Sequence, residues 1–322
     1  MSVMKKIAVS AVTVVMAVSA LPVTTFAAPH QNEWDQKSDG KWYYYDYYGK
    51  KVKYDSAPYY DTGTGTTKYY VLNSKGARVT STGWYTTKYG MTSYYNKVKF
   101  TTKYYLKSDG SCTTGWKKIG KKYYYFYSDG KMATSTSVWS KDGTKLYVVG
   151  ADGARITKKG WYQLTYKYLS SSSGKVISDK YWYFVKTDKT AATRIKKIGG
   201  KKYLFNDAGM LVQNDWYSFR NKNDEWEYYA ADKNGKLLTK KGKNTINYKS
   251  VHEGTDYVET RNIKKVVYVT EGGKLHLGLK KIKGKYYYFG PQMYRQTYCT
   301  VDGVKYFFGK TGASTKVIKL DA

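Results

Sequence analysis

The sequence has little of what enzymes and disulfide-rich proteins are built from. Only two cysteines occur in 322 residues, too few for a disulfide framework. The three histidines, His30, His252 and His276, show no metal-ligand spacing, so we expect no metal site and no cofactor. No serine or cysteine nucleophile motif stands out. These absences favour a non-catalytic protein, with an enzyme whose site is unrecognised as the alternative.

Acidic residues are also scarce. The 24 Asp and Glu face 56 Lys and Arg, which gives a formal net charge of +32. Asp109, Asp129 and Asp152 each precede a glycine and have a turn role, which leaves few carboxylates for acid–base catalysis. A charge of this size indicates the kind of partner and not the fold. We therefore expect a polyanionic partner.

Long hydrophobic runs are missing except at the amino terminus. Two lysines precede an apolar stretch from Ile7 to about Ala20, and small residues lead up to Ala27. This order predicts a signal peptide at residues 1–27. The alternative is a membrane anchor, for which the run is too short. We expect a secreted chain with no transmembrane segment, and no nucleic acid as its partner.

The chain is rich in tyrosine, with 39 residues beside 9 Trp and 9 Phe. Tyrosine favours half-buried strands. The aromatic residues recur in one frame: Tyr, any residue, an apolar residue, three residues, then Gly. The copies are Tyr43–Gly49, Tyr70–Gly76, Tyr104–Gly110, Tyr124–Gly130, Tyr147–Gly153, Tyr203–Gly209, Tyr229–Gly235 and Tyr306–Gly312, with Val267–Gly273 as a variant and Tyr183–Lys189 and Tyr287–Met293 lacking the Gly.

Each frame predicts a β-hairpin. Its first and third positions share one face of a strand, because side chains alternate. The closing glycine usually follows Asp or Asn, as in Asp129-Gly130 and Asn234-Gly235. Such dipeptides are favoured in hairpin turns because both central residues need positive φ.

The frames group in threes. Those that end at Gly76, Gly153, Gly235 and Gly312 are 77, 82 and 77 residues apart, which indicates a superrepeat of about 80 residues. Each superrepeat contains one expanded segment, which we interpret as a longer or additional hairpin. These segments are residues 84–100, 161–180 and 242–265.

The predicted fold is all-β, a solenoid of stacked β-hairpin repeats, because a lone hairpin cannot bury enough surface to be stable. The alternative is a single compact β-barrel or sandwich. We expect a short N-terminal lead at 28–38, tandem repeats at 39–313 and a C-terminal tail at 314–322. In an extended stack Cys112 and Cys299 lie too far apart for a disulfide, and Cys112 is expected to be a small apolar filler.

One stretch carries a family pattern. Gly115-Trp116, Gly120, Tyr123-Tyr124-Tyr125-Phe126 and Asp129-Gly130-Lys131-Met132 resemble the cell-wall-binding repeat of the choline-binding type. Related repeats occur in glucan-binding domains. The resemblance covers roughly residues 39–313, and it implies stacked hairpins with ligands in aromatic cages between consecutive units. The ligand-binding candidates that it implies are Trp42, Trp84, Trp116, Tyr123, Met132, Trp139, Trp161 and Trp216.

The methionine of that pattern is matched only by Met132, and other frames place residues such as Lys51, Arg78 or Arg155 there. Quaternary ammonium groups are held by cation–π attraction, so a cation in the cage would repel them. Choline is therefore not the expected ligand of most units. The best candidate cage lies around Trp116, Tyr123, Met132 and Trp139.

Lysines concentrate in links between the aromatic segments. The candidates for polyanion binding are Lys117, Lys118, Lys121, Lys122, Lys196, Lys197, Lys201, Lys202, Lys280 and Lys281. Repeated along a solenoid, they would form a basic stripe that binds a linear polyanion with high avidity.

The sequence thus predicts a secreted, non-catalytic cell-wall-binding protein, retained at the bacterial wall or surface. Its expected partner is teichoic acid, another anionic glycan or a polysaccharide. One alternative is an adhesin or matrix protein that binds neutral or host glycans. The other is an unrecognised wall-active enzyme.

Overall fold

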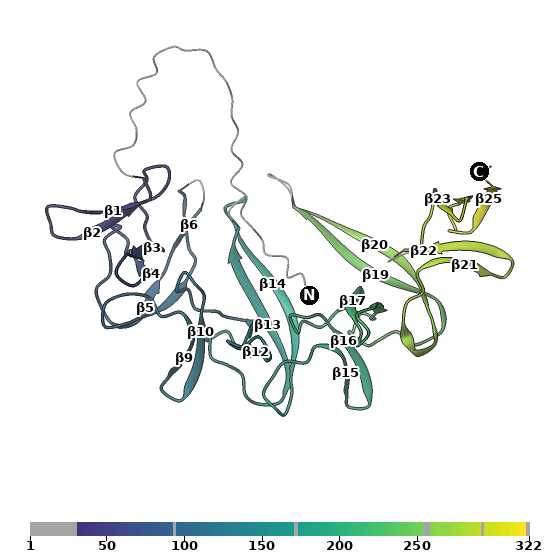
Figure 1. The fold of residues 1–322 in the computed structure, drawn as a ribbon, viewed down its shortest axis with the longest axis horizontal. Helices are drawn as coiled ribbons and strands as arrows, with labels where there is room; N and C mark the ends of the chain where they lie inside the picture. The colour runs from purple at the N-terminus through teal and green to yellow at the C-terminus, as the bar shows by residue number, and fades with distance from the viewer. Residues whose placement is uncertain (1–30, 93–94, 171–172, 254–257, 291–292, 320–322) are drawn as a thin grey trace, which may run out of the picture.

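The chain folds into an open arc of short hairpins (Figure 1). The structure is a computed structural model, and it describes residues 31–319 except 93–94, 171–172, 254–257 and 291–292. The predicted signal peptide lies outside the described residues. The one helical element among them is the 3₁₀ turn η1, Glu271–Gly273. No helix in this part of the chain is long and apolar enough to cross a membrane.

The strands follow one another closely along the chain. They are β1 Glu33–Gln36, β2 Trp42–Tyr45, β3 Ser56–Asp61, β4 Thr66–Val71, β5 Gly83–Thr87, β6 Gly90–Met91, β7 Lys97–Val98, β8 Thr102–Leu106, β9 Gly115–Ile119, β10 Lys122–Phe126, β11 Thr136–Trp139, β12 Leu146–Val149, β13 Gly160–Leu169, β14 Val176–Val185, β15 Arg194–Ile198, β16 Lys201–Phe205, β17 Trp216–Arg220, β18 Trp226–Ala230, β19 Gly242–Glu253, β20 Val258–Val269, β21 Gly278–Ile282, β22 Lys285–Phe289, β23 Thr297–Val301, β24 Val304–Phe308 and β25 Ser314–Lys319.

Strands pair almost entirely with their neighbours in the sequence. The described strands form eleven two-stranded sheets and one three-stranded sheet, β23-β24-β25. Only the pair β5–β8 encloses another hairpin, β6–β7. This arrangement confirms the predicted solenoid of hairpins, and the alternative of one continuous barrel or sandwich is wrong for the described chain.

Main-chain hydrogen bonds join each unit to the one before it. The residue two positions after the end of a frame donates its N–H to the carbonyl just before the preceding frame. We call this residue the junction residue. The bonds, 2.7–2.9 Å long, run from Arg78 to Trp42, Cys112 to Tyr69, Met132 to Lys103, Arg155 to Tyr123, Ala191 to Leu146, Leu211 to Trp182, Leu237 to Lys202 and Leu275 to Tyr228. Such nearest-neighbour contacts are what defines a solenoid.

The frame glycine closes a different turn from the predicted one. The N–H of Gly130 donates to the carbonyl of Tyr127 at 2.9 Å, and the N–H of Tyr127 donates to that of Lys131 at 2.9 Å. Gly130 has a φ of 83°, whereas Asp129 is not among the residues of positive φ. The turn is therefore a type I turn followed by a left-handed glycine. Asp129 is suited to it because its Oδ1 accepts the N–H of Lys131 at 3.0 Å.

The same glycines allow close stacking. A Cβ on Gly130 would lie 2.4 Å from the Cβ of Cys112, the junction residue of the preceding unit. A Cβ on Gly153 would lie equally close to the Cε of Met132. The frame therefore needs glycine both for its backbone conformation and for contact with the preceding unit.

The superrepeat appears in the contacts as well as in the sequence. The hydroxyl of Ser56 donates to the carbonyl of Asp129 at 2.7 Å, and that of Ser137 donates to the carbonyl of Ala208 at 2.6 Å. These bonds are the same contact in successive superrepeats. The expanded segments form the small hairpin β6–β7 and the long hairpins β13–β14 and β19–β20, as predicted. Figure 1 shows these long hairpins on one side of the arc and β9–β10 and β15–β16 on the other.

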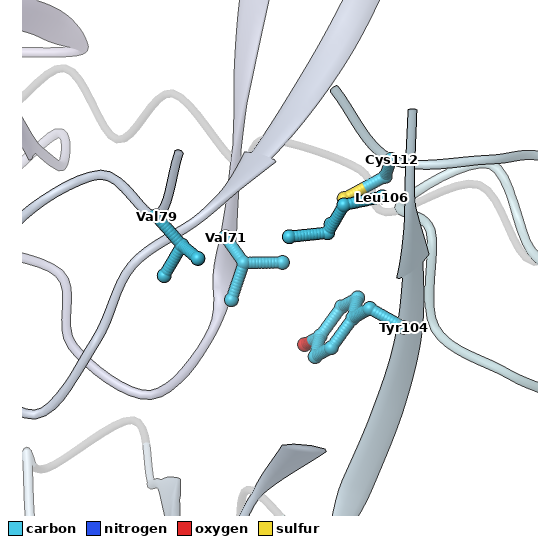
Figure 2. Packing of buried hydrophobic residues seen from close by; sticks show 5 residues of the cluster. All are labelled: Val71, Val79, Tyr104, Leu106 and Cys112. Atoms are coloured by element: carbon cyan, nitrogen blue, oxygen red, sulfur yellow. The ribbon is translucent and has the colours of Figure 1, made fainter. Parts of the chain in front are cut away.

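Each unit contributes a few side chains to a small core between neighbours. Figure 2 shows one such cluster, in which Cys112 packs with Val71, Tyr104 and Leu106. Cys112 is 2% exposed, which confirms its role as an apolar filler. Burial raises the pKa of its thiol to about 12. Both Cys112 and Cys299 are free thiols.

The stack is longer at both ends than predicted. Strand β1 pairs with β2, and Trp34 packs with its ring centroid 5.4 Å from that of Tyr44. Residues 33–36 thus belong to the first hairpin and not to a lead. At the other end β25 pairs with β24, so residues 314–319 form a strand and not a tail.

Candidate ligand-binding groove

The predicted basic links are hairpins, which corrects their interpretation as connectors. Lys117 and Lys118 lie on β9 and pair with Tyr124 and Tyr123 on β10. The same arrangement recurs in β15–β16 and β21–β22. The two-residue turn of β15–β16 is Gly199-Gly200, with φ of 55° and 79°, as such hairpin turns require. The lysines therefore project from hairpins along the stack.

Most of these lysines have no acidic partner within the described chain. Lys122 forms an ion pair with Asp152 at 3.0 Å. Lys280 and Lys281 lie over the rings of Tyr268 and Tyr286, 4.9 and 5.5 Å from the centroids. Those without an ion pair to a described residue are Lys117, Lys118, Lys121, Lys196, Lys197, Lys201 and Lys202.

Lysines also face one another. Lys197 and Lys202 are directly opposite in the β15–β16 register. Like charges at such positions are destabilising, and a bound anion would relieve the repulsion. The charge on this hairpin is therefore suited to a ligand more than to internal pairing.

Three tryptophans that follow glycine pack between consecutive units. The ring centroids of Trp84, Trp116 and Trp161 lie 5.0–5.5 Å from the first tyrosine of the next frame, respectively Tyr124, Tyr147 and Tyr203. Trp84 is still 44% exposed. These rings therefore support the stack and also wall the spaces between units.

The largest of these spaces is a groove at Trp161. It has a volume of about 570 Å³ and lies between β13–β14 and β15–β16. The rings of Trp161 and Phe184, 5.1 Å apart, form its apolar wall. Its rim carries four lysines, Lys159, Lys186, Lys196 and Lys197. The groove thus combines an aromatic face with concentrated positive charge.

One carboxylate lies among these lysines. Asp188 forms an ion pair with Lys186 at 3.1 Å and accepts hydrogen bonds from the hydroxyl and N–H of Thr190 at 2.7 and 3.0 Å. Burial opposes ionisation, but these partners outweigh it and lower the pKa of Asp188 to about 2. Asp188 neutralises Lys186, so the net charge of the groove comes from the other three lysines.

Trp182 is a site residue that the sequence prediction missed. It directly precedes the frame Tyr183–Lys189, in the place that Trp42 holds in the first frame. Its ring lies 6.4 Å from that of Trp161, and its carbonyl accepts the N–H of Leu211 at 2.8 Å. The missing glycine of that frame hid it, and aligning the frames on their tyrosines would have found it.

The predicted cage around Trp116 is only partly assembled. The indole N–H of Trp116 donates to the carbonyl of Trp139 at 2.8 Å, so these two residues are adjacent. Met132 is 7% exposed and packs beneath Gly153. The ring of Tyr123 is covered by Arg155, whose Cζ is 5.0 Å from the centroid. The charged side chain, and not Met132, is the junction residue that meets Tyr123.

The remaining predicted tryptophans lie at separate units. Trp42 is 40% exposed, and its carbonyl accepts the N–H of Arg78. The ring of Trp216 lies 5.9 Å from that of Tyr228. The candidates are thus distributed along the arc as a series of inter-unit positions and not gathered in one pocket.

Catalytic chemistry finds no support in the part of the chain that the structure describes. No group of three or more His, Cys, Asp or Glu there could hold a metal ion. The carboxylates with the clearest structure, such as Asp129 and Asp188, accept hydrogen bonds within their own turns.

Comparison with known families agrees with this geometry. Residues 113–161 match the choline-binding repeat, and residues 278–292 match a cell wall binding repeat family. The chain carries cell-wall-binding repeats of the choline-binding type. The first match spans Trp116, Tyr123 and Arg155, so it covers one complete junction between these choline-binding-type repeats.

Similar proteins include enzymes and non-enzymes that bear such repeats. Glucosyltransferase-S of Streptococcus mutans is 30% identical over 136 residues, which are 40% of this chain and 8% of that protein. The chain therefore spans a small part of this curated relative. The structure of choline binding protein F of Streptococcus pneumoniae is 20% identical over 88% of this chain and 92% of its own, with a TM-score of 0.33. An alternansucrase structure is 14% identical over 88% of this chain and 18% of its own, also with a TM-score of 0.33.

Proposed function

We propose that this chain is a secreted wall-binding module that holds an anionic wall polymer of the teichoic acid class. The observation that carries the proposal is the groove at Trp161, where an aromatic wall lies beside Lys159, Lys196 and Lys197. An aromatic face can stack on a sugar ring, and ammonium groups bind phosphate as point charges. The polymer supplies both groups in alternation.

Repetition supports binding along the polymer. Lys117 and Lys118 precede Lys196 and Lys197 by 79 residues and hold the same strand positions in β9–β10. Lys280 and Lys281 follow them by 84 residues on β21. Several weak sites on one chain act on one polymer with high avidity. Because the contacts are ionic and exposed, retention should weaken steeply as salt rises.

The test is retention on purified cell walls, with and without their anionic polymers, across a salt series. We expect the double variant K196Q/K197Q to lose about tenfold in affinity, since two charged contacts are removed. The control K240Q/K241Q removes the same charge from exposed positions outside the groove and should bind nearly as the wild type does. Salt-resistant retention on stripped walls would contradict the proposal.

A neutral glycan is the second candidate ligand. The partial match to a glucosyltransferase and the aromatic wall of the groove favour it. In that case Trp161→Ala would abolish retention on stripped walls, while K196Q/K197Q would leave it unchanged. The two ligand classes are thus separated by which variant loses binding.

We also propose that the chain binds without catalysing a reaction. Its relatives include enzymes, and the chain spans a small fraction of their length. The support is the sparse, turn-bound set of carboxylates described above. Incubation with labelled walls should release no soluble sugar, and any time-dependent release that follows the purified chain would overturn this part of the proposal.

A further inference from the structure

Two junction residues are arginines that lie against aromatic rings. The Cζ of Arg155 is 4.5 Å from the ring centroid of Tyr147 and 5.0 Å from that of Tyr123. The Cζ of Arg78 is 3.7 Å from the ring centroid of Tyr70. Both arginines occupy the same position of the frame, 77 residues apart. The repeated geometry marks it as a property of the junction and not of one loop.

Arg155 fills the space between two units. Tyr123 belongs to one unit and Tyr147 to the next, and Trp116 packs against Tyr147 with ring centroids 5.5 Å apart. The Nε of Arg155 is buried and has no hydrogen-bond partner within the described chain. Cation–π attraction to the two tyrosine faces is what stabilises a guanidinium in such surroundings. We call the space between Tyr123 and Tyr147 the tyrosine slot.

Other junctions of the stack hold an apolar residue at the same position. They include Met132, Leu211 and Leu275, all of which make the same main-chain bond to the preceding unit. The backbone therefore tolerates either kind of side chain. What changes is whether the aromatic space contains a cation that belongs to the protein.

We propose that Arg155 is a specificity-determining residue that closes the tyrosine slot to cationic ligands by occupying it. Arg78 does the same at Tyr70. The repeat at 113–161, which matches the choline-binding family, is then an aromatic cation site that the chain fills with its own guanidinium. A soluble quaternary ammonium ion competes with a tethered cation and meets its charge repulsion. The inference is independent of the polymer proposed for the Trp161 groove.

The test is titration with choline chloride, followed by intrinsic fluorescence and by thermal unfolding. We expect Arg155→Leu to bind choline on the order of tenfold more tightly than the wild type does, with a choline-dependent rise in melting temperature. Arg155→Lys keeps a cation at the junction and should stay closed. Arg295→Leu removes the same charge from an exposed position and should also show no gain. A folded Arg155→Leu protein that gains no affinity would overturn the inference.

A second measurement uses the wild-type protein and does not depend on a variant that folds. The Arg155 Nε–H proton should show an upfield ring-current shift in NMR spectra, because the guanidinium lies over tyrosine faces. This shift should persist at high choline concentration. A random-coil resonance for that proton would refute the occupied slot. Wall retention that depends on Trp161 would be unaffected by either result, so the two proposals fail separately.

Discussion

The fit between a turn glycine and the preceding junction residue predicts a specific stability difference. Gly130 and Gly153 have nearly equal φ, 83° and 81°, so alanine at either position suffers the same left-handed strain of about 1–2 kcal/mol. The contacts differ. An added Cβ at Gly130 meets the Cβ of Cys112 at 2.4 Å, whereas at Gly153 it meets the Cε of Met132 at the same distance.

The two neighbours respond differently to this clash. The Cβ of Cys112 is fixed by the backbone, so Gly130→Ala must also shift one unit against the other, an overpacking cost of about 1–3 kcal/mol. The end of Met132 can rotate away because the side chain is unbranched and flexible. We therefore expect Gly130→Ala to cost about 2–5 kcal/mol in all and Gly153→Ala to cost only about 1–2 kcal/mol.

The assay is urea unfolding of both variants and the wild type, followed by tryptophan fluorescence and far-ultraviolet circular dichroism. Gly120→Ala is the control, because a Cβ there meets nothing within 4 Å. The double variant G130A/C112G removes the fixed Cβ and should recover part of the loss. Equal destabilisation by Gly130→Ala and Gly153→Ala would show that backbone conformation alone requires the glycine, and the stacking argument would then be wrong.

Three further predictions concern single residues. Trp161→Ala should lower the free energy of unfolding by about 3 kcal/mol, because its ring contacts both units, and polymer retention should fall with it; Trp161→Phe should restore stability before retention. Cys112, buried and with its pKa raised to about 12, should react with a thiol reagent at pH 8 only after unfolding, whereas half-buried Cys299 should react first in the native protein. Asp188 is stabilised in its ionised form, so its contribution to stability is present above the unfolded pKa near 3.8 and is lost as pH falls through about 2; the melting-temperature difference between wild type and Asp188→Asn should stay constant from pH 7 to 5 and change below pH 4.

The sequence was sufficient to predict the hairpins and their period. Tyrosine at alternate positions and the recurring glycine are local signals, and the 80-residue spacing needs only counting. The pairing partner of each frame strand was harder to predict. The Asp-Gly dipeptide is a strong turn signal, so the frame was interpreted as one hairpin. In the structure its strand pairs mainly with the strand that precedes it, as β10 pairs with β9, and the lysines therefore lie on hairpin arms.

The site was harder to predict than the fold because it forms between units. Trp161 could be found from the glycine before it, but Trp182 required alignment across a frame without its glycine. The contact of Arg155 with Tyr123 joins residues 32 positions apart. No local pattern shows which side chain of one unit meets which ring of the next until the junction bond fixes the register.

The junction residue separates the architecture of this stack from its binding properties. Its N–H holds the unit in place, and any residue except proline can donate that bond. Its side chain lies in the space between units, as Arg155 does beside Tyr147 and Leu211 does beside Trp161. Substitution there can therefore change which ligand an inter-unit space accepts without altering the main-chain bond that maintains the stack. A chain that keeps the hairpins but places arginine at some junctions and leucine at others retains the fold of a choline-binding-type repeat while distributing different binding properties along one molecule.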